Sequence, residues 1–328
     1  MKLLIISNNP SRPSFRQRVE IFLESFHSNG IEAEVHKLPK CYIERWKLFK
    51  KAEKFDAVLL HKKCLNFFDV KCLRKHARKI IYDFDDAVMY KASRPQSENT
   101  SHMRLFARTA KMADCVIAGN DYLAQHARRF NKNVHVIPTG LVVDDYKTGD
   151  VRPNDGKVRL VWIGSSATLK YLEQLKAVLE QIGQKFDNVV LRIICDSFLK
   201  FKNIKVEENR WSLETQASDL SACDIGLAPL PDNRFTRGKC GYKILQYMAA
   251  GLAATASPVG VNRQFIEESR AGLLAENENQ WVEIITKLIN DNSARQQMAA
   301  NAKEYVKKFS RDVIAQKIIK TIRACVAS

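Results

Sequence analysis

DIGLAPLPDNRFTRGKCGYKILQYMAAGLAATASPVGVN, residues Asp224–Asn262, is the stretch that decides the fold of this 328-residue chain. It predicts a short apolar strand over Ile225–Leu230, a polar basic loop, and a helix over Tyr242–Ala250. Gly251 suits the position just after a helix. A second strand of small residues, Leu252–Ala256, follows. Strand, loop, helix and strand in this order indicate a parallel α/β unit.

The start of the predicted helix is a favourable place for an anion. Free amide groups and the positive end of the helix dipole point outward there. Gly238 and Gly241 bracket the end of the loop, and Arg237, Lys239 and Lys243 add positive charge at the same end. We therefore predict a cradle for a ligand phosphate. The alternative is a plain α/β helix that begins with glycine and carries a lysine.

The run GYKILQYMAAGLAATASPVG resembles the signature of the retaining GT-B glycosyltransferases of the family-4 type. In that family a Glu-x7-Glu pair brackets this helix start, and the text reads about EAMAxGxPVVA. Here Gly238 and Gln246 stand at the two glutamate positions, so both acids are absent. Bacterial surface-polysaccharide enzymes of this type have lysine-rich text and YMA here, as this chain does. The resemblance implies that Gln246 faces the donor.

A second predicted cradle is WIGSSATLK, where a strand ends in Gly164, Ser165 and Ser166 and a helix begins. Backbone amides and Lys170 are expected to face one point, although an ordinary turn between strand and helix has the same pattern. The family carries an arginine and a lysine here for the nucleotide diphosphate. Lys170 matches the lysine, and the place of the arginine falls near Ser165. The resemblance thus implies that Lys170 and Lys243 stabilise the leaving diphosphate.

Strand and helix patterns alternate along the whole chain, which predicts two Rossmann-like α/β domains facing across a cleft. We place an acceptor-side domain at residues 1–145, a nucleotide-sugar domain at 146–310 and a crossing helix at 311–328. The linker falls within Leu141–Lys157, where Asp, Gly, Pro and Asn are frequent. Single amphipathic helices are expected at Ser14–Ser28 and over the leucine-rich stripe from Leu169 to Ile182.

An acidic cluster, Asp83-Phe84-Asp85-Asp86, follows a predicted strand. We expect Asp85 or Asp86 to face the cleft near the donor sugar or the acceptor hydroxyl, as a catalytic group. Two alternatives stay open: an Asp-x-Asp metal motif such as GT-A glycosyltransferases carry, and an N-cap of the next helix. Arg16 and Arg18, in the first loop and helix, resemble a paired-arginine position of the family and are expected to contact donor phosphate or an anionic acceptor.

The net charge of +17 is the compositional anomaly, and most of the basic residues precede residue 150. Nucleic acid, an anionic membrane and an anionic substrate all fit such a charge. Nucleic acid is not expected, because the basic residues are spread rather than gathered in one run. A basic helix at about Ile43–Lys54 mixes Trp46 and Phe49 with lysines, which suits a membrane interface. Alternatively, these two aromatic side chains pack inward.

The eight cysteines form no CxxC pair, and no apolar run is long enough for a signal peptide or a membrane span. A cytoplasmic protein with reduced thiols is expected, peripheral at the inner membrane face. The combined reading is a glycosyltransferase that moves a sugar from a nucleotide-diphosphate donor to a glycan or lipid-linked hydroxyl, with no metal and no cofactor. Two alternatives are a catalytically inactive homologue that acts as a partner subunit and a basic nucleic-acid-binding α/β protein.

Overall fold

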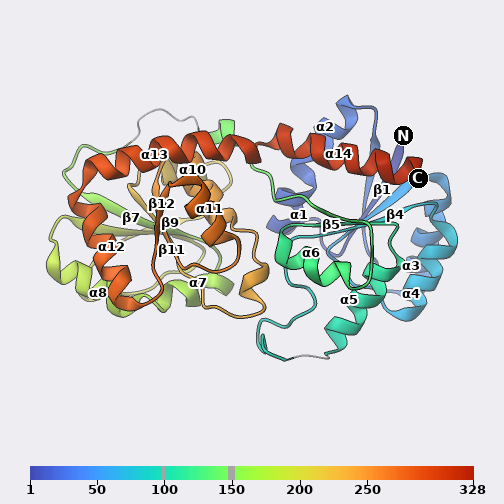
Figure 1. Cartoon of the computed structure of the whole chain (residues 1–328), viewed down its shortest axis with the longest axis horizontal. Helices are drawn as coiled ribbons and strands as arrows, with labels where there is room; N and C mark the ends of the chain where they lie inside the picture. The colour runs from blue at the N-terminus through green and yellow to red at the C-terminus, as the bar shows by residue number, and fades with distance from the viewer. Residues whose placement is uncertain (98–99, 147–151) are drawn as a thin grey trace. The chain divides into compact units, whose positions relative to one another are not determined.

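The computed structural model describes residues 1–97, 100–146 and 152–328. The chain forms two compact units (Figure 1). The first unit comprises Met1–Leu141, Asn233–Cys240 and Phe309–Ser328, and the second comprises Val142–Asp232 and Gly241–Lys308. Asn233–Cys240 therefore belongs to the first unit, whereas we had placed it in the C-terminal domain from its position in the sequence. Part of the predicted linker, residues 147–151, lies outside the described residues.

The first unit is built on a six-stranded parallel sheet in the order β2-β1-β3-β4-β5-β6. Its strands are β1 (Lys2–Ser7), β2 (Glu32–Lys37), β3 (Ala57–His61), β4 (Ile80–Phe84), β5 (Cys115–Ala118) and β6 (Val134–Val136). Its helices are α1 (Pro13–Arg18), α2 (Leu23–Ser28), α3 (Tyr42–Lys51), α4 (Phe67–His76), α5 (Ser101–Met112), α6 (Asp121–Arg128) and α14 (Arg311–Ala327), with 3-10 turns at Glu20–Phe22, Ala52–Lys54 and Thr236–Gly238.

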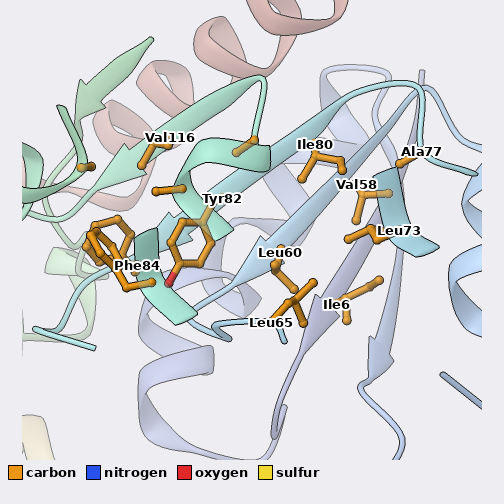
Figure 2. Close-up of a cluster of buried hydrophobic side chains, with 14 of the residues drawn as sticks. Ile6, Val58, Leu60, Leu65, Leu73, Ala77, Ile80, Tyr82, Phe84 and Val116 are labelled. Atoms are coloured by element: carbon orange, nitrogen blue, oxygen red, sulfur yellow. The ribbon is translucent and has the colours of Figure 1, made fainter. Parts of the chain in front are cut away.

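Alternate residues of each strand face opposite sides of this sheet, and each side is covered by helices. On one side, residues of β1, β3, β4 and β5 pack with side chains of α3 to α6. Figure 2 shows Leu65, Leu73 and Ala77 against the strands on this side. On the other side, Leu3 and Ile5 pack against α1, α2 and α14. The prediction that the last helix returns to the first domain is confirmed, because its apolar face completes that core.

The second unit repeats the architecture with the strand order β12-β11-β10-β7-β8-β9, again parallel. Its strands are β7 (Val158–Ile163), β8 (Val189–Cys195), β9 (Lys205–Arg210), β10 (Ile225–Ala228), β11 (Ala253–Ala256) and β12 (Gly272–Leu274). Its helices are α7 (Ser166–Glu173), α8 (Lys176–Lys185), α9 (Gln216–Ser221), α10 (Tyr242–Ala249), α11 (Val261–Ser269), α12 (Glu278–Asn290) and α13 (Asn292–Val306), with 3-10 turns at Val143–Tyr146 and Lys307–Phe309. The predicted α/β class with two Rossmann-like domains is confirmed.

Two helices predicted as continuous are broken. Ser14–Ser28 divides at Val19, whose φ of −134° and ψ of −56° leave the helical region, and the preceding Arg18 points into the interior. The apolar stripe from Leu169 to Ile182 is buried as predicted, but α7 ends before Leu175 and α8 starts after it. Apolar spacing reports which face is buried, and it is insensitive to a break that keeps that face inward.

Strand β9 was not predicted, since its sequence KVEENR is mostly polar. It is an edge strand that pairs only with β8, so little of it faces a core. Polar and charged residues are the usual composition of such edges, because they discourage pairing with other chains. Strand β12, at the opposite edge, has only three residues and was also missed.

Candidate functional site

The second sheet changes its winding direction between β7 and β10, the place where open parallel sheets bind ligands beyond their carboxyl ends. The two strands pair only at Ile225–Leu160 and Gly226–Val161, and then separate. Tyr247 of α10 lies where they part. Its hydroxyl donates to the Leu227 carbonyl at 2.9 Å and accepts the Ile163 amide at 3.4 Å. We did not predict a role for Tyr247, although it is the tyrosine of the YMA sequence that carries the family resemblance.

Lys243, in the first turn of α10, lies at the carboxyl end of β7. Its ammonium group donates to the Ile163 carbonyl and stands 4.4 Å from the centre of the Trp162 ring. A Cβ atom on Gly164 would come within 2.6 Å of Lys243 Nζ. The structure thus brings together two residues that the sequence assigned to separate cradles, 79 positions apart by their numbers. A cation, an open strand end and a helix N-terminus meet at this edge.

Gly241 is the N-cap of α10 and has a φ of +65°, which favours glycine. A side chain here would also approach the Phe265 ring of α11, with Cβ 2.8 Å from Cε2. This backbone turn directs the first amides of α10 outward from the helix. Gly241 and Lys243 lie in the second unit, at the helix start for which we predict a phosphate cradle.

The Gly-Ser-Ser turn before α7 already holds an anion from the protein itself. The Ser166 amide donates to Asp196 Oδ1 at 2.7 Å, and the Ser166 hydroxyl donates to Oδ2 at 2.9 Å. The hydrogen bond from the Ser166 backbone amide is the main reason that the pKa of Asp196 falls to about 2. The Ser165 amide donates to Thr168 Oγ1 at 3.2 Å. Lys170 is exposed, with Nζ 5.5 Å from the centre of the Tyr171 ring.

Gln246 is buried inside the second unit. Its Nε2 donates to Tyr146 Oη at 3.1 Å and to Gln216 Oε1 at 3.2 Å, and Gln216 Oε1 also accepts from the Trp211 indole at 3.3 Å. An amide suits this place, since a buried carboxylate facing the Gln216 carbonyl oxygen would be costly. We predicted donor contact for Gln246, and the structure gives it these internal partners.

In the first unit, Asp83 lies near the carboxyl end of β4, beside the buried side chains of Arg18 and His61. Arg18 Nη2 lies 2.8 Å from Asp83 Oδ1, and His61 Nδ1 lies 3.2 Å from Oδ2. Burial by itself would raise the pKa of Asp83, but the charge of Arg18 and the bond from His61 bring it below its ordinary value. Arg18 also donates to the Ile137 and Pro138 carbonyls at 2.7 and 2.9 Å. Sequence spacing gave no signal of this pairing.

Asp85 and Asp86 follow Asp83 and face two lysines. Lys62 Nζ lies 3.1 Å from Asp85 Oδ1 and also pairs with Asp86, while Lys239 Nζ lies 3.0 Å from Asp86 Oδ1. Burial alone would raise the pKa of Asp86, but the charges of Lys239 and Lys62 outweigh this effect and hold the pKa below its ordinary value. The carboxylate is therefore ionised at neutral pH. Lys62 has a φ of +60°, a conformation that costs about 1–2 kcal/mol for a residue with a side chain.

Lys239 reaches this cluster because Asn233–Cys240 packs within the first unit. The Asn120 amide group donates to the Gly238 and Lys239 carbonyls at 3.3 and 3.2 Å, and the Tyr122 hydroxyl donates to the Arg234 carbonyl at 3.0 Å. A Cβ atom on Gly238 would stand 2.7 Å from the Ala87 methyl group, so only glycine allows this approach. We predicted Lys239 as a donor-cradle residue, whereas its ammonium group pairs with Asp86.

Two further predicted site residues belong to the first unit. Arg237 is exposed in the 3-10 turn of the docked segment, and Arg16 is half-buried in α1. Within the described ranges, no three His, Cys, Asp or Glu side chains are grouped so that they could hold a metal ion. None of the described helices combines the length and apolarity that a bilayer crossing requires.

Comparisons with known proteins agree with this architecture. Residues 149–291 match the family described as Glycosyl transferases group 1. Sucrose-phosphate synthase from Thermosynechococcus elongatus superposes with a TM-score of 0.75 at 16% identity, covering 99% of both chains. Anabaena HepE, solved in complex with UDP-glucose, gives 0.73 at 14% identity over 99% of this chain and 100% of its own.

A UDP-forming trehalose-phosphate synthase from Burkholderia xenovorans gives a TM-score of 0.67 at 12% identity, with 99% of both chains covered. No curated protein matches the chain by sequence. At these identities the solved structures establish a shared fold. The family match spans most of the second unit, including β7, β10 and α10, and also the segment Asn233–Cys240. Residues 149–291 thus match the Glycosyl transferases group 1 family, in a chain whose two Rossmann-like domains have the GT-B fold.

Proposed function

We propose that this protein is a family-4-like glycosyltransferase that moves a sugar from a nucleotide-diphosphate donor to a hydroxyl of a glycan or lipid-linked acceptor. The observation that carries the proposal is the meeting of Lys243, Gly164 and the α10 N-terminus at the winding change of a group 1 glycosyl transferase domain. Helix N-termini and lysines are the usual partners of diphosphates. The Anabaena structure, which has the same fold, was solved with UDP-glucose.

In this proposal, the donor diphosphate lies at the start of α10. Lys243 and the first amides of α10 stabilise the negative charge that develops as the bond to the sugar breaks, which lowers the barrier electrostatically. We propose no metal ion and retention of configuration, with attack on the same face as the leaving group. The exposed Lys170 of α7 supplies a second positive charge to the diphosphate in this proposal.

The leaving phosphate accepts the acceptor proton in this scheme. Asp86 is poorly suited to that role. Burial alone would raise the pKa of Asp86, but two ammonium groups hold it below the ordinary value, so the carboxylate is a weak base. We assign Asp85 and Asp86 to positioning of the acceptor hydroxyl or the donor sugar. A lipid-linked acceptor in bacterial surface-polysaccharide biosynthesis, met at the cytoplasmic membrane face, agrees with the basic first unit.

A thermal-shift series with nucleoside diphosphates tests the donor. A ligand at 100 times its dissociation constant adds about 2.7 kcal/mol to the free energy of unfolding. We expect one nucleoside diphosphate to raise the melting temperature of the second unit, with the matching monophosphate weaker. If no nucleoside diphosphate changes the melting temperature at millimolar concentration, the donor assignment is wrong.

A catalytically inactive homologue that binds a partner is the second candidate. It is favoured by Gly238 and Gln246, which stand where the family has glutamates, and by the internal partners of Gln246. Slow hydrolysis of the donor sugar-nucleotide separates the two candidates. An enzyme releases nucleoside diphosphate with no acceptor present, whereas an inactive homologue binds the donor and leaves it intact.

A further inference from the structure

Large apolar side chains are exposed where α3 and α4 begin. Tyr42, Ile43 and Trp46 of α3 and Phe67 and Phe68 of α4 are between 43% and 67% exposed. We call these five residues the α3–α4 patch. Across residues 1–97, 100–146 and 152–328, only Leu213 and Val313 are large apolar side chains with comparable exposure. Two neighbouring helices therefore carry five of the seven exposed large apolar side chains of the described residues.

The two helices that carry the patch are neighbours. Helices α3 and α4 pack against each other (Figure 1), and Arg45 Nη1 joins Asp69 Oδ2 at 2.6 Å between their first turns. The rings of Phe67 and Phe68 meet edge to face with centroids 5.7 Å apart. Leu48 and Phe49 turn inward to the core. The helix predicted at Ile43–Lys54 thus divides: Phe49 packs inward, and Trp46 stays outside.

Cations surround the exposed rings. Lys50 Nζ stands 5.4 Å from the centre of the Trp46 ring, and Lys71 Nζ stands 4.4 Å from the centre of the Phe67 ring. Arg108 of α5 reaches the same Phe67 ring at 5.8 Å. The acidic neighbour Glu44 pairs with Lys47 at 2.9 Å, and Asp69 is buried. A surface of apolar rings edged by cations is complementary to anionic lipid.

We propose that the α3–α4 patch docks the first unit on an anionic bilayer. The apolar side chains enter the boundary between headgroups and acyl chains, and Lys47, Lys50, Lys71 and Arg108 contact the headgroups. Each such cation strengthens binding by about fivefold. Helices α3 and α4 start after the carboxyl ends of β2 and β3, so the patch lies at the edge of the sheet that also carries Asp85 and Asp86. The docking names a membrane as the partner, and its role in transfer rests on the proposed function.

Vesicle binding of the full chain tests the surface. We expect sedimentation with vesicles of phosphatidylglycerol and phosphatidylcholine, little with phosphatidylcholine alone, and release as salt rises. Phe67→Ser with Phe68→Ser, and separately Lys47→Glu with Lys50→Glu and Lys71→Glu, should each weaken binding at least tenfold. Matched controls are Leu213→Ser with Val313→Ser, and Lys185→Glu with Lys287→Glu and Lys317→Glu, which alter exposed residues elsewhere and should bind like the parent.

Trp46 gives a second signal, because Trp162 and Trp281 are buried and the half-buried Trp211 belongs to the second unit. Anionic vesicles should shift the tryptophan emission to shorter wavelength, and Trp46→Phe should abolish that shift without loss of binding. Unchanged sedimentation of the patch variants, or equal binding to neutral vesicles, would overturn the proposal. Dissociation of a dimer by Phe67→Ser with Phe68→Ser, with sedimentation unaltered, would identify a contact between copies instead. Nucleoside diphosphate binding is measured separately, so a failed donor assignment and a failed docking surface give different results.

Discussion

At the scale of single residues, charge pairing decides what each predicted site residue can do. Lys243 lies at the carboxyl end of β7, where its ammonium group donates to the Ile163 carbonyl and stands 4.4 Å from the centre of the Trp162 ring. Lys239 lies only four positions earlier, but its ammonium group is committed to Asp86. Two lysines from one basic loop therefore have different roles.

Lys243→Ala should lower the affinity for the nucleoside diphosphate that stabilises the parent by about 10- to 150-fold. This corresponds to about 1.5–3 kcal/mol for a lost charge-assisted hydrogen bond. Calorimetric titration measures it, and binding of the bare nucleoside should hardly change. Lys170→Ala is expected to act in the same direction. Lys176→Ala, an exposed lysine of α8, is the control, and equal affinities in all three variants would remove the assignment.

Asp86→Asn should destabilise the first unit at neutral pH by about 1–3 kcal/mol, because it leaves Lys62 and Lys239 without the carboxylate they share. The pKa of Asp86 is lowered in the folded state, so its stabilising contribution is present above the ordinary pKa of 3.8 and is lost as pH falls through the lowered value. Urea unfolding at several pH values should show a smaller acid-dependent loss in Asp86→Asn than in the parent. The exposed Asp312→Asn serves as the control.

At the scale of elements, the segment Asn233–Cys240 is the unexpected feature. It connects β10 to α10, two elements of the second unit, but it packs in the first. Asn120 links it to α6, since its Oδ1 caps that helix by accepting the Leu123 amide at 2.9 Å while its amide group holds the segment. The Asn120 side chain thus caps the start of α6 and also holds the segment Asn233–Cys240 in place.

Asn120→Asp separates these two tasks, since aspartate caps helices as well as asparagine does but has no amide donor. We expect a loss of about 1–3 kcal/mol, because a carboxylate would face two carbonyl oxygens. Faster tryptic cleavage at Arg234, Arg237 or Lys239 should report local release of the segment. Asn277→Asp, the same change at the cap of α12, should stay within about 0.5 kcal/mol of the parent. Equal effects at both positions would mean that only capping matters.

At the scale of the whole molecule, we propose that positive charge takes the place that a metal ion would have in phosphate neutralisation. The sequence carries 53 basic and 36 acidic side chains, and the carboxylates of the Asp83–Asp86 cluster are already paired with Arg18, Lys62 and Lys239. In the proposed function, a diphosphate at α10 contacts a lysine and a helix N-terminus. We therefore expect that neither site needs a divalent ion to balance its charge.

Donor turnover should continue unchanged in EDTA. Steady-state release of nucleoside diphosphate, before and after chelation, measures this. Loss of turnover with recovery on adding Mn²⁺ or Mg²⁺ would assign Asp85 and Asp86 to metal binding and overturn the proposed metal-free mechanism. Asp85→Asn should then also abolish the recovery, whereas a structural role of Asp85 would leave the metal dependence intact.

The sequence alone determined the α/β architecture, because apolar strands that alternate with amphipathic helices bury their faces in few other ways. It also placed Gly241 and Lys243 at a helix start, since these signals are local in the chain. Only the tertiary structure decided which partner each polar group has. Asp196 occupies the start of α7, Gln216 holds Gln246, and Lys239 pairs with Asp86, 153 positions away. Such pairings depend on which loops the folded sheets place next to each other. The spacing of residues along the chain does not indicate which distant loops become neighbours.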